Sequence, residues 1–309
     1  MRNNENTGLA SLCAAVAILA GATAAAGIFA RGDGSSVTVT SVRGETYAMA
    51  TTGVYAYNAL RVVSEGIGWD LFTLLLAVPA TLVAVPSVRR GSFRGRLFAL
   101  GMFGYFLYQY VEYSVTWAFG PLFLPFVVIY AASLGGIVWI GRSVALDGLR
   151  DRFGAGFPGR PWAVLSIGMA LLLTTMWLQR IALGMSGDLA GAALNGETTM
   201  VVQAFDLGLV VPSTFLIGIL AWRDTPAGRT LAAIYAVTFV AMSAAIGCML
   251  LSAWAVEGTP EIVPIAIFGA AALAGALLGW RMYRAALPMT PETGVRSTIA
   301  GRRLSATGR

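Results

Sequence analysis

The sequence contains no histidine and no lysine, so all 21 of its basic residues are arginine. Without histidine, the chain cannot provide a bis-histidine haem site, an ordinary zinc-hydrolase site, a histidine general base or a phosphorelay. Without lysine, a Schiff base to retinal and a lysine-dependent nucleotide site are excluded as well. The two cysteines, Cys13 and Cys248, lie in apolar stretches, where small-residue packing is their expected role. The sequence predicts no cofactor and no metal site.

Charged residues are also scarce, at 12% of the chain, whereas 57% of the residues are hydrophobic. With a mean hydropathy of +0.73, this composition is typical of a polytopic membrane protein. We therefore predict an all-α membrane protein with one transmembrane domain over residues 1–284. Its eight expected transmembrane helices cover 9–30, 69–88, 97–119, 122–141, 162–182, 205–222, 230–254 and 262–280.

The first apolar stretch has two interpretations. It is either a transmembrane helix or a signal peptide with an Ala-Thr-Ala cleavage site at 22–24. Its apolar run of about 22 residues exceeds the 7–15 residues of the apolar region of a signal peptide, which favours the helix. The following loop, 31–68, becomes less polar along its length, so its second part is expected to form a strand or a helix at the membrane surface.

The arginines indicate the orientation, because cytoplasmic loops of membrane proteins are enriched in basic residues. If the N-terminus is cytoplasmic, 17 of the 21 arginines lie on the cytoplasmic side, and only Arg31, Arg43, Arg61 and Arg180 lie outside. Both termini are thus predicted to be cytoplasmic. The tail 285–309 has a disordered, basic composition, and its expected partner is anionic lipid headgroups rather than nucleic acid.

The most informative stretch, 96–121, is long enough to span a bilayer and is unusually polar. Tyr105, Tyr108, Gln109 and Glu112 follow one another at spacings of three, one and three residues, which places them on one face of a helix. An ionisable group such as Glu112 costs roughly 2.5–3.5 kcal/mol or more to insert, so it normally faces other helices or a wet cavity. Glu112 therefore marks a candidate site in the outer half of the bilayer.

The segments 69–100 and 205–234 resemble each other. Each begins with an aromatic residue followed by Asp-Leu, continues through proline-interrupted apolar residues, and leaves through a short turn with glycine and arginine. Both would run from outside to inside. This similarity leads to the hypothesis of two parallel four-helix halves, 1–142 and 160–284, related by an axis along the membrane normal.

In that arrangement Asp70 and Asp206 are equivalent carboxylates at the outer ends of two helices, where each could also cap its own helix N-terminus. Arg180, at the outer end of another helix, is the natural ionic partner for these carboxylates or for Glu112. Two interpretations stay open, a ligand or ion site and a packing clasp of ion pairs and tyrosine hydroxyls. The candidate ligand-binding residues are Glu112, Asp70, Asp206, Arg180, Tyr105, Tyr108 and Gln109.

The run YFLYQYVEYSVTWAFGPLFL at 105–124, with WDL at 69–71 and FDLGLVVP at 205–212, resembles an uncharacterised group of bacterial multi-pass membrane proteins. The resemblance covers about residues 50–285. It implies a location in the bacterial plasma membrane, and it brings no activity and no functional residue with it.

Three classes of function remain open. The leading hypothesis is a membrane protein that binds or transports a small ligand or cation through an outward-facing polar site. The alternatives are a membrane-embedded enzyme acting on lipid, with carboxylates and a metal held by oxygen ligands, and a structural subunit that binds another copy or another membrane protein. No nucleotide-binding domain is found in the sequence, so transport would be passive or gradient-driven unless a partner supplies ATP.

Overall fold

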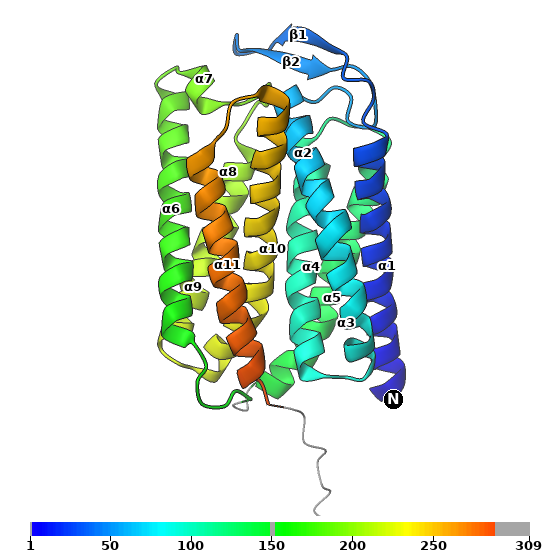
Figure 1. The fold of residues 1–309 in the computed structure, drawn as a ribbon, viewed down its shortest axis with the longest axis vertical. Coiled ribbons are helices and arrows are strands. Elements are labelled where there is room, and N and C mark those ends of the chain that lie inside the picture. The colour runs from blue at the N-terminus through cyan, green and yellow to red at the C-terminus, as the bar shows by residue number, and fades with distance from the viewer. Residues whose placement is uncertain (1, 149–151, 288–309) are drawn as a thin grey trace, which may run out of the picture.

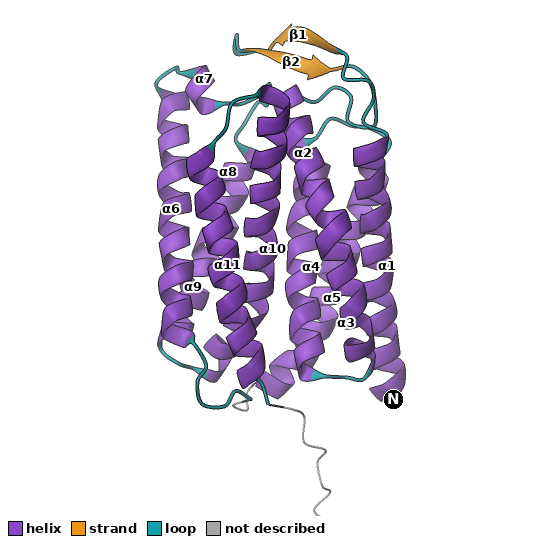
Figure 2. Cartoon of the chain, viewed as in Figure 1, coloured by secondary structure: helices purple, strands orange, loops and turns teal. Residues whose placement is uncertain are grey.

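The computed structural model describes residues 2–148 and 152–287 of the 309-residue chain. Long helices run side by side along the longest axis, and a two-stranded hairpin lies across one end (Figure 1). Figure 2 shows that the hairpin contains the strands and that the rest of the described chain is helices and loops. The start of the first helix and the end of the last lie at the opposite end. We refer to the two ends of the bundle as the hairpin end and the N-terminal end.

The first part of the chain forms one helix, the hairpin, a helical rod made of three segments, and then two more helices. The elements are α1 (Arg2–Phe29), β1 (Ser36–Thr40), β2 (Thr46–Ala50), α2 (Leu60–Phe72), the π-helical segment η1 (Thr73–Ala77), α3 (Val78–Arg89), α4 (Phe93–Thr116) and α5 (Phe123–Gly148). The second part repeats the order of long helices. Its elements are α6 (Gly159–Met185), α7 (Leu189–Ala192), α8 (Val201–Phe205), the π-helical segment η2 (Asp206–Val210), α9 (Val211–Trp222), α10 (Pro226–Glu257) and α11 (Ile262–Ala285).

Seven of the described helices are long and apolar enough to cross a membrane, which identifies a multi-pass membrane protein in contact with lipid. They are Asn4–Phe29, Leu60–Arg89, Phe123–Val144, Gly159–Met185, Val201–Trp222, Pro226–Glu257 and Ile262–Ala285. The predicted count of eight is not confirmed, because α4 is not among them. This 24-residue helix contains several polar residues and packs against α3, α5 and α10.

The second helix begins nine residues earlier than its predicted start at residue 69, at Leu60. This start could not be predicted from the apolar pattern, because Arg61 and Glu65 interrupt it there. The segment before it folds into the antiparallel hairpin, in which Ser36 pairs with Ala50. The expected strand in this loop is therefore present. The predicted disorder of the tail concerns residues after 287, which lie outside the described residues.

The helices of the two predicted halves have the same neighbours. In the first half, α1 and α4 each pack against α3 and α5, and in the second half α6 and α10 each pack against α9 and α11. The start of α1 and the end of α11 lie at the same end of the bundle (Figure 1). That this end faces the cytoplasm, and that the halves superpose by rotation about the membrane normal, both stay predictions.

Some local features recur in the two predicted halves at a spacing of 133 residues. The segments η1 and η2 start at residues 73 and 206, and each is followed by a helix with proline near its start. Ser92 accepts a hydrogen bond from the amide of Gly95 at the start of α4, and Thr225 does the same for Gly228 at the start of α10. This spacing pairs Thr73, not Asp70, with Asp206. The expected equivalence of Asp70 and Asp206 is therefore displaced by three residues.

The contact between the halves is uneven. Helix α2 packs along α10, whereas α8, which corresponds to α2 in the other half, makes only a small contact with α4. The α2–α10 crossing is close because Gly68 has no side chain: a β-carbon there would overlap the backbone carbonyl of Cys248. The bundle is therefore tightly closed on one side of the interface between the halves and open on the other.

Candidate ligand cavity between the two halves

A cavity of about 1050 Å³ lies on the open side, at the upper end of the size range of small-molecule sites. Its walls come from α4 and α5 of the first half and from α6, η2, α9 and α10 of the second. The lining residues on α10 extend from Ala227 to Ile246, 19 positions, which at 1.5 Å per residue corresponds to about 28 Å. The cavity thus runs along a length similar to the thickness of a hydrocarbon core, about 30 Å.

The two acidic side chains of the cavity wall lie near its hairpin end and are joined by a tyrosine. The Tyr108 hydroxyl donates a hydrogen bond of 2.5 Å to Oδ1 of Asp206, and the indole Nε1 of Trp177 donates one of 2.8 Å to Oδ2 of the same carboxylate. The Glu112 carboxyl, one helical turn after Tyr108, also interacts with this tyrosine hydroxyl and lies within electrostatic reach of Asp206. Helices α4, α6 and η2 therefore bring these four side chains together.

We call Glu112, Asp206, Tyr108 and Trp177 the acid cluster. Within it, the carboxyl of Glu112 has an oxygen atom without a hydrogen-bond partner in the described part of the chain. Its side chain is buried at 6% exposure, and its Oε1 has no hydrogen-bond partner among the described residues. Such buried polar atoms are rare in proteins because each one loses its water without a replacement. A third carboxylate, Glu197 in the loop between α7 and α8, lies within electrostatic reach of Glu112, and partial burial raises the pKa of Glu197 to about 7.

The charge of the cavity wall has one sign. The described lining residues include Glu112 and Asp206 and no arginine. Most of the other lining side chains are aliphatic or aromatic, and three of the polar ones have partners of their own: Thr214 and Tyr235 share a hydrogen bond of 2.6 Å, and Thr238 donates to the carbonyl of Gly101. The cavity therefore offers an apolar wall with one acidic region.

Asp70 does not reach this cavity. It is 1% exposed and receives hydrogen bonds from the hydroxyls of Tyr55 (2.5 Å) and Tyr113 (3.3 Å). Gly27 of α1 packs so closely against this pair that a β-carbon there would overlap the Asp70 carboxylate and the Tyr55 hydroxyl. The interpretation of Asp70 and Asp206 as N-terminal caps is wrong, because both lie inside helical rods that begin at residues 60 and 201.

Tyr105 and Gln109 form a third, separate group. The Tyr105 hydroxyl lies 2.7 Å from Oγ1 of Thr73, which donates a hydrogen bond of 3.0 Å to Oε1 of Gln109. All three side chains are fully buried between α4 and the η1 segment. The face of α4 predicted as one polar surface is therefore divided: Tyr105 and Gln109 turn toward the first half, and Tyr108 and Glu112 turn toward the cavity.

Arg180 lies apart from all three predicted carboxylate partners. Its guanidinium stacks 5.6 Å from the ring of Trp177, and it has no ion pair within the described residues. Its charge acts mainly with those of Glu65, Glu261 and Arg61, on the hairpin side of the acid cluster. The expected pairing of Arg180 with Glu112, Asp70 or Asp206 is therefore absent.

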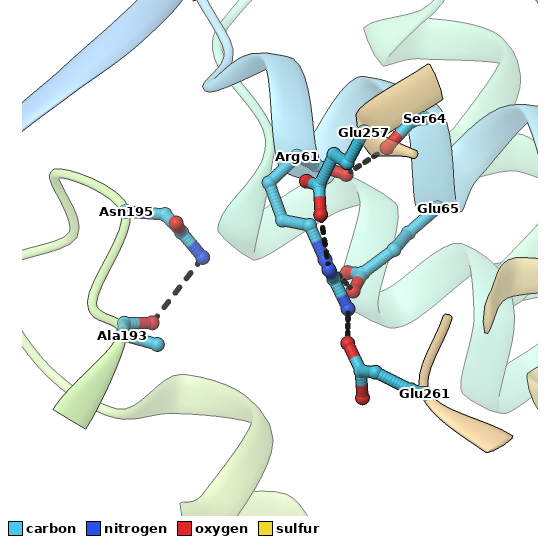
Figure 3. Close-up of polar contacts among 7 residues, drawn as sticks. All are labelled: Arg61, Ser64, Glu65, Ala193, Asn195, Glu257 and Glu261. Atoms are coloured by element: carbon cyan, nitrogen blue, oxygen red, sulfur yellow. Dashed lines mark hydrogen bonds and ion pairs between the residues drawn. The ribbon is translucent and has the colours of Figure 1, made fainter. Parts of the chain in front are cut away.

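The ionic cluster at the hairpin end centres on Arg61. Figure 3 shows its guanidinium facing the carboxylates of Glu65, Glu257 and Glu261. It forms ion pairs of 2.6 Å with Glu65 and 2.7 Å with Glu257, and a further one with Glu261. Since Arg61 lies on α2 and the last two carboxylates lie at the end of α10 and the start of α11, this cluster ties the two halves together.

A second link between the halves runs from the hairpin. The two carboxylate oxygens of Glu45, between β1 and β2, accept hydrogen bonds of 3.2 Å from the backbone amides of Asn195 and Gly196. Arg43 donates one of 3.1 Å to the carbonyl of Thr198 in the same loop. The hairpin of the first half is thus fastened to the loop that precedes α8 in the second half.

Replacing Arg61 by alanine is expected to destabilise the protein, because three carboxylates would be left facing one another without their cation. We expect a loss of about 2 kcal/mol, limited by solvent screening because the side chains are 26–43% exposed. Thermal denaturation of the purified protein in detergent measures this, and the loss should shrink at high salt. Arg31→Ala, at an exposed position of the same end, is the control and should leave the melting temperature unchanged. Equal melting temperatures for the two variants would contradict this role of Arg61.

Several residues of these groups were missed from the sequence. Trp177, Tyr55 and Arg61 are absent from the candidate residues of the sequence analysis, and the last two lie in the expected loop 31–68. A signal for Arg61 was available, since Glu65 follows at the i+4 spacing of a helical ion pair. Tyr55 and Trp177 meet their carboxylates from 15 and 29 residues away, and no local pattern indicates such pairings.

Comparison with known proteins gives no relative from which a role could be transferred: no protein-family model matches the chain, and no curated protein or solved structure matches it significantly.

Proposed function

We propose that this membrane protein binds a small positively charged ligand in the cavity between its halves and moves it across the bilayer. The observation that carries the proposal is the buried Oε1 of Glu112, which lines the cavity and has no hydrogen-bond partner among the described residues. A bacterial plasma-membrane location belongs to the same proposal and rests on the sequence resemblance.

The charge of the ligand follows from the charge of the wall. Two neighbouring carboxyls, Glu112 and Asp206, are costly to keep in a low-dielectric site unless a cation or a proton compensates them. The Asp206 carboxylate has partial compensation from the donors on Tyr108 and Trp177. Glu112 lacks a comparable donor for Oε1, and a cationic ligand would supply the missing charge.

The position of the acid cluster supports access from outside. Glu112 lies four residues before the end of α4, about 6 Å of helix rise from the hairpin end of that helix. The hairpin end is the predicted outer end, because the described part of the chain places four arginines there, Arg31, Arg43, Arg61 and Arg180, and the other described arginines near the N-terminal end. A ligand from outside would meet the acid cluster first.

Binding of the radiolabelled lipophilic cation tetraphenylphosphonium tests the proposal. The purified protein should bind it in a scintillation proximity assay, and Glu112→Gln should weaken binding at least tenfold while the melting temperature changes little. Glu5→Gln, the same chemical change at an exposed position of α1, is the matched control and should bind like the unmodified protein. In proteoliposomes with an imposed membrane potential, uptake above that of empty liposomes should be lost in Glu112→Gln.

Two results would overturn the proposal. If Glu112→Gln bound tetraphenylphosphonium as tightly as Glu5→Gln, the acid cluster would have no part in binding. If neither the unmodified protein nor Glu5→Gln bound the cation, and Glu112→Gln lowered the melting temperature, Glu112 would serve packing instead.

A further inference from the structure

We infer that the ligand is a single-chain amphiphile with a cationic amine headgroup, which enters the cavity sideways from the bilayer between α5 on one side and α6 and the η2 segment on the other. This inference rests on the proposed function of the acid cluster and names its substrate class. It depends on three features of the cavity, namely its length, its side opening and the location of its charge.

The length and the polarity of the cavity match an elongated amphiphile. The acid cluster lies near one end of a space that follows α10 for about 28 Å, and the walls beyond it toward the N-terminal end are lined mainly by apolar side chains such as Leu100, Ile137 and Leu231. One leaflet of the hydrocarbon core is only about 15 Å thick. An alkyl chain that fits one leaflet therefore also fits along this cavity with its headgroup at Glu112.

The cavity is open at its side. Three lining residues have large exposed fractions: Leu134 of α5 at 49%, Leu172 of α6 at 38% and Leu209 of η2 at 60%. Across the described residues, α5 makes little or no contact with α6 or with η2, although all three line the cavity.

The depth of this opening determines what meets it. Leu172 is the fourteenth of the 27 residues of α6, and Leu134 is the twelfth of the 26 residues of α5. Both leucines are therefore near the middle of helices that span the hydrocarbon core, where the surrounding molecules are lipid chains rather than water. A ligand that passes between them comes from the bilayer, so it carries an apolar chain.

The headgroup is assigned from the acid cluster. A primary ammonium group has three donors and one positive charge, and it would give Oε1 of Glu112 the hydrogen bond that it lacks. A carboxylate headgroup would bring a third negative charge next to Glu112 and Asp206, without an arginine among the described lining residues to neutralise it. Chain and charge together point to a long-chain amine.

Three probes separate the contributions of chain and charge: dodecylamine, butylamine and dodecanoic acid, each added to the purified protein and counted as bound molecules by native mass spectrometry. We expect dodecylamine to bind at least tenfold more tightly than butylamine. We expect no specific binding of dodecanoic acid, and at least tenfold weaker dodecylamine binding in Glu112→Gln. Equal affinities for the two amines would overturn the chain assignment, and equal binding of the acid would overturn the charge assignment.

The side opening has its own test in lipid nanodiscs. The double variant L134W/L209W places two large side chains at the opening and should slow dodecylamine binding at least tenfold. The acid cluster itself is unchanged in this variant. Leu216→Trp, on an exposed part of α9 that does not line the cavity, is the matched control. Unchanged dodecylamine binding in the double variant would refute lateral entry. If butylamine bound as tightly as dodecylamine and its binding required Glu112, this inference would be refuted and the proposed function would stand. If the binding of every amine were unaffected by Glu112→Gln, both would be refuted.

Discussion

Replacing Gly68 by alanine is expected to lower the stability of the protein by about 3 kcal/mol or more, enough to be seen as loss of monodisperse protein on purification. The new β-carbon would overlap the backbone carbonyl of Cys248, at the closest approach of α2 and α10. Overpacking usually costs about 1–3 kcal/mol because side chains can adjust. Here the obstacle is backbone, so the two halves would have to move apart.

The neighbouring glycine on α10 gives the control for this experiment. Gly247→Ala changes the residue next to Cys248, where the described structure has no other atom within 4 Å of the new β-carbon. It should be neutral or stabilising by about 0.5–1 kcal/mol, because alanine favours the helix. Thermal denaturation and size-exclusion chromatography in detergent measure both variants. Indistinguishable profiles would mean that the close contact of α2 and α10 is not what joins the halves.

Replacing Gly27 by alanine is expected to have a similarly large effect inside the first half. The added β-carbon would overlap the Asp70 carboxylate and the Tyr55 hydroxyl, both of which are buried. To make room, the pair would have to separate and leave a buried carboxylate without its shortest hydrogen bond. We expect a loss of about 3 kcal/mol, which combines overpacking with an unsatisfied buried group.

A buried glycine on the same helix serves as the matched control. A β-carbon at Gly21 would meet Cγ1 of Val78 at 3.5 Å, an ordinary van der Waals contact. Gly21→Ala should therefore leave the melting temperature unchanged or raise it slightly, whereas Gly27→Ala should lower it by several degrees. The pairing of Asp70 with Tyr55 would have to be abandoned if Gly27→Ala melted at the temperature of Gly21→Ala.

The membrane class of the protein could be predicted because hydropathy is a sum over neighbouring residues. A long apolar run can be recognised without knowing which helices pack against it. Seven of the described helices are long and apolar enough to cross a membrane. The start of α2 could not be predicted in the same way. Arg61 looks like a loop residue because its compensating charges on Glu257 and Glu261 are almost 200 positions away in the sequence.

The candidate site was predicted only in part for a related reason. The helical spacing correctly places Tyr108 and Glu112 on one side of α4, and the repeated aromatic-Asp-Leu pattern indicates Asp206. The same spacing grouped Tyr105 and Gln109 with them, because a helical wheel shows which residues share a face and not which helix covers it. The cavity itself depends on the small contact between α8 and α4, compared with the close packing of α2 against α10. This difference in packing cannot be predicted from the sequence of any one segment.

The π-helical segments bear on which sequence changes the protein can tolerate. Such a segment holds one residue more than the α-helical turn it replaces, so the helix before it is rotated relative to the helix after it. Deleting one residue from η2, for example Gly208, would restore a regular α-helix and turn Asp206 by about 100° relative to α9. That rotation would carry the carboxylate away from Tyr108 and Trp177. In this stretch a one-codon deletion would therefore be more damaging than most substitutions, and the length of the segment matters as much as its composition.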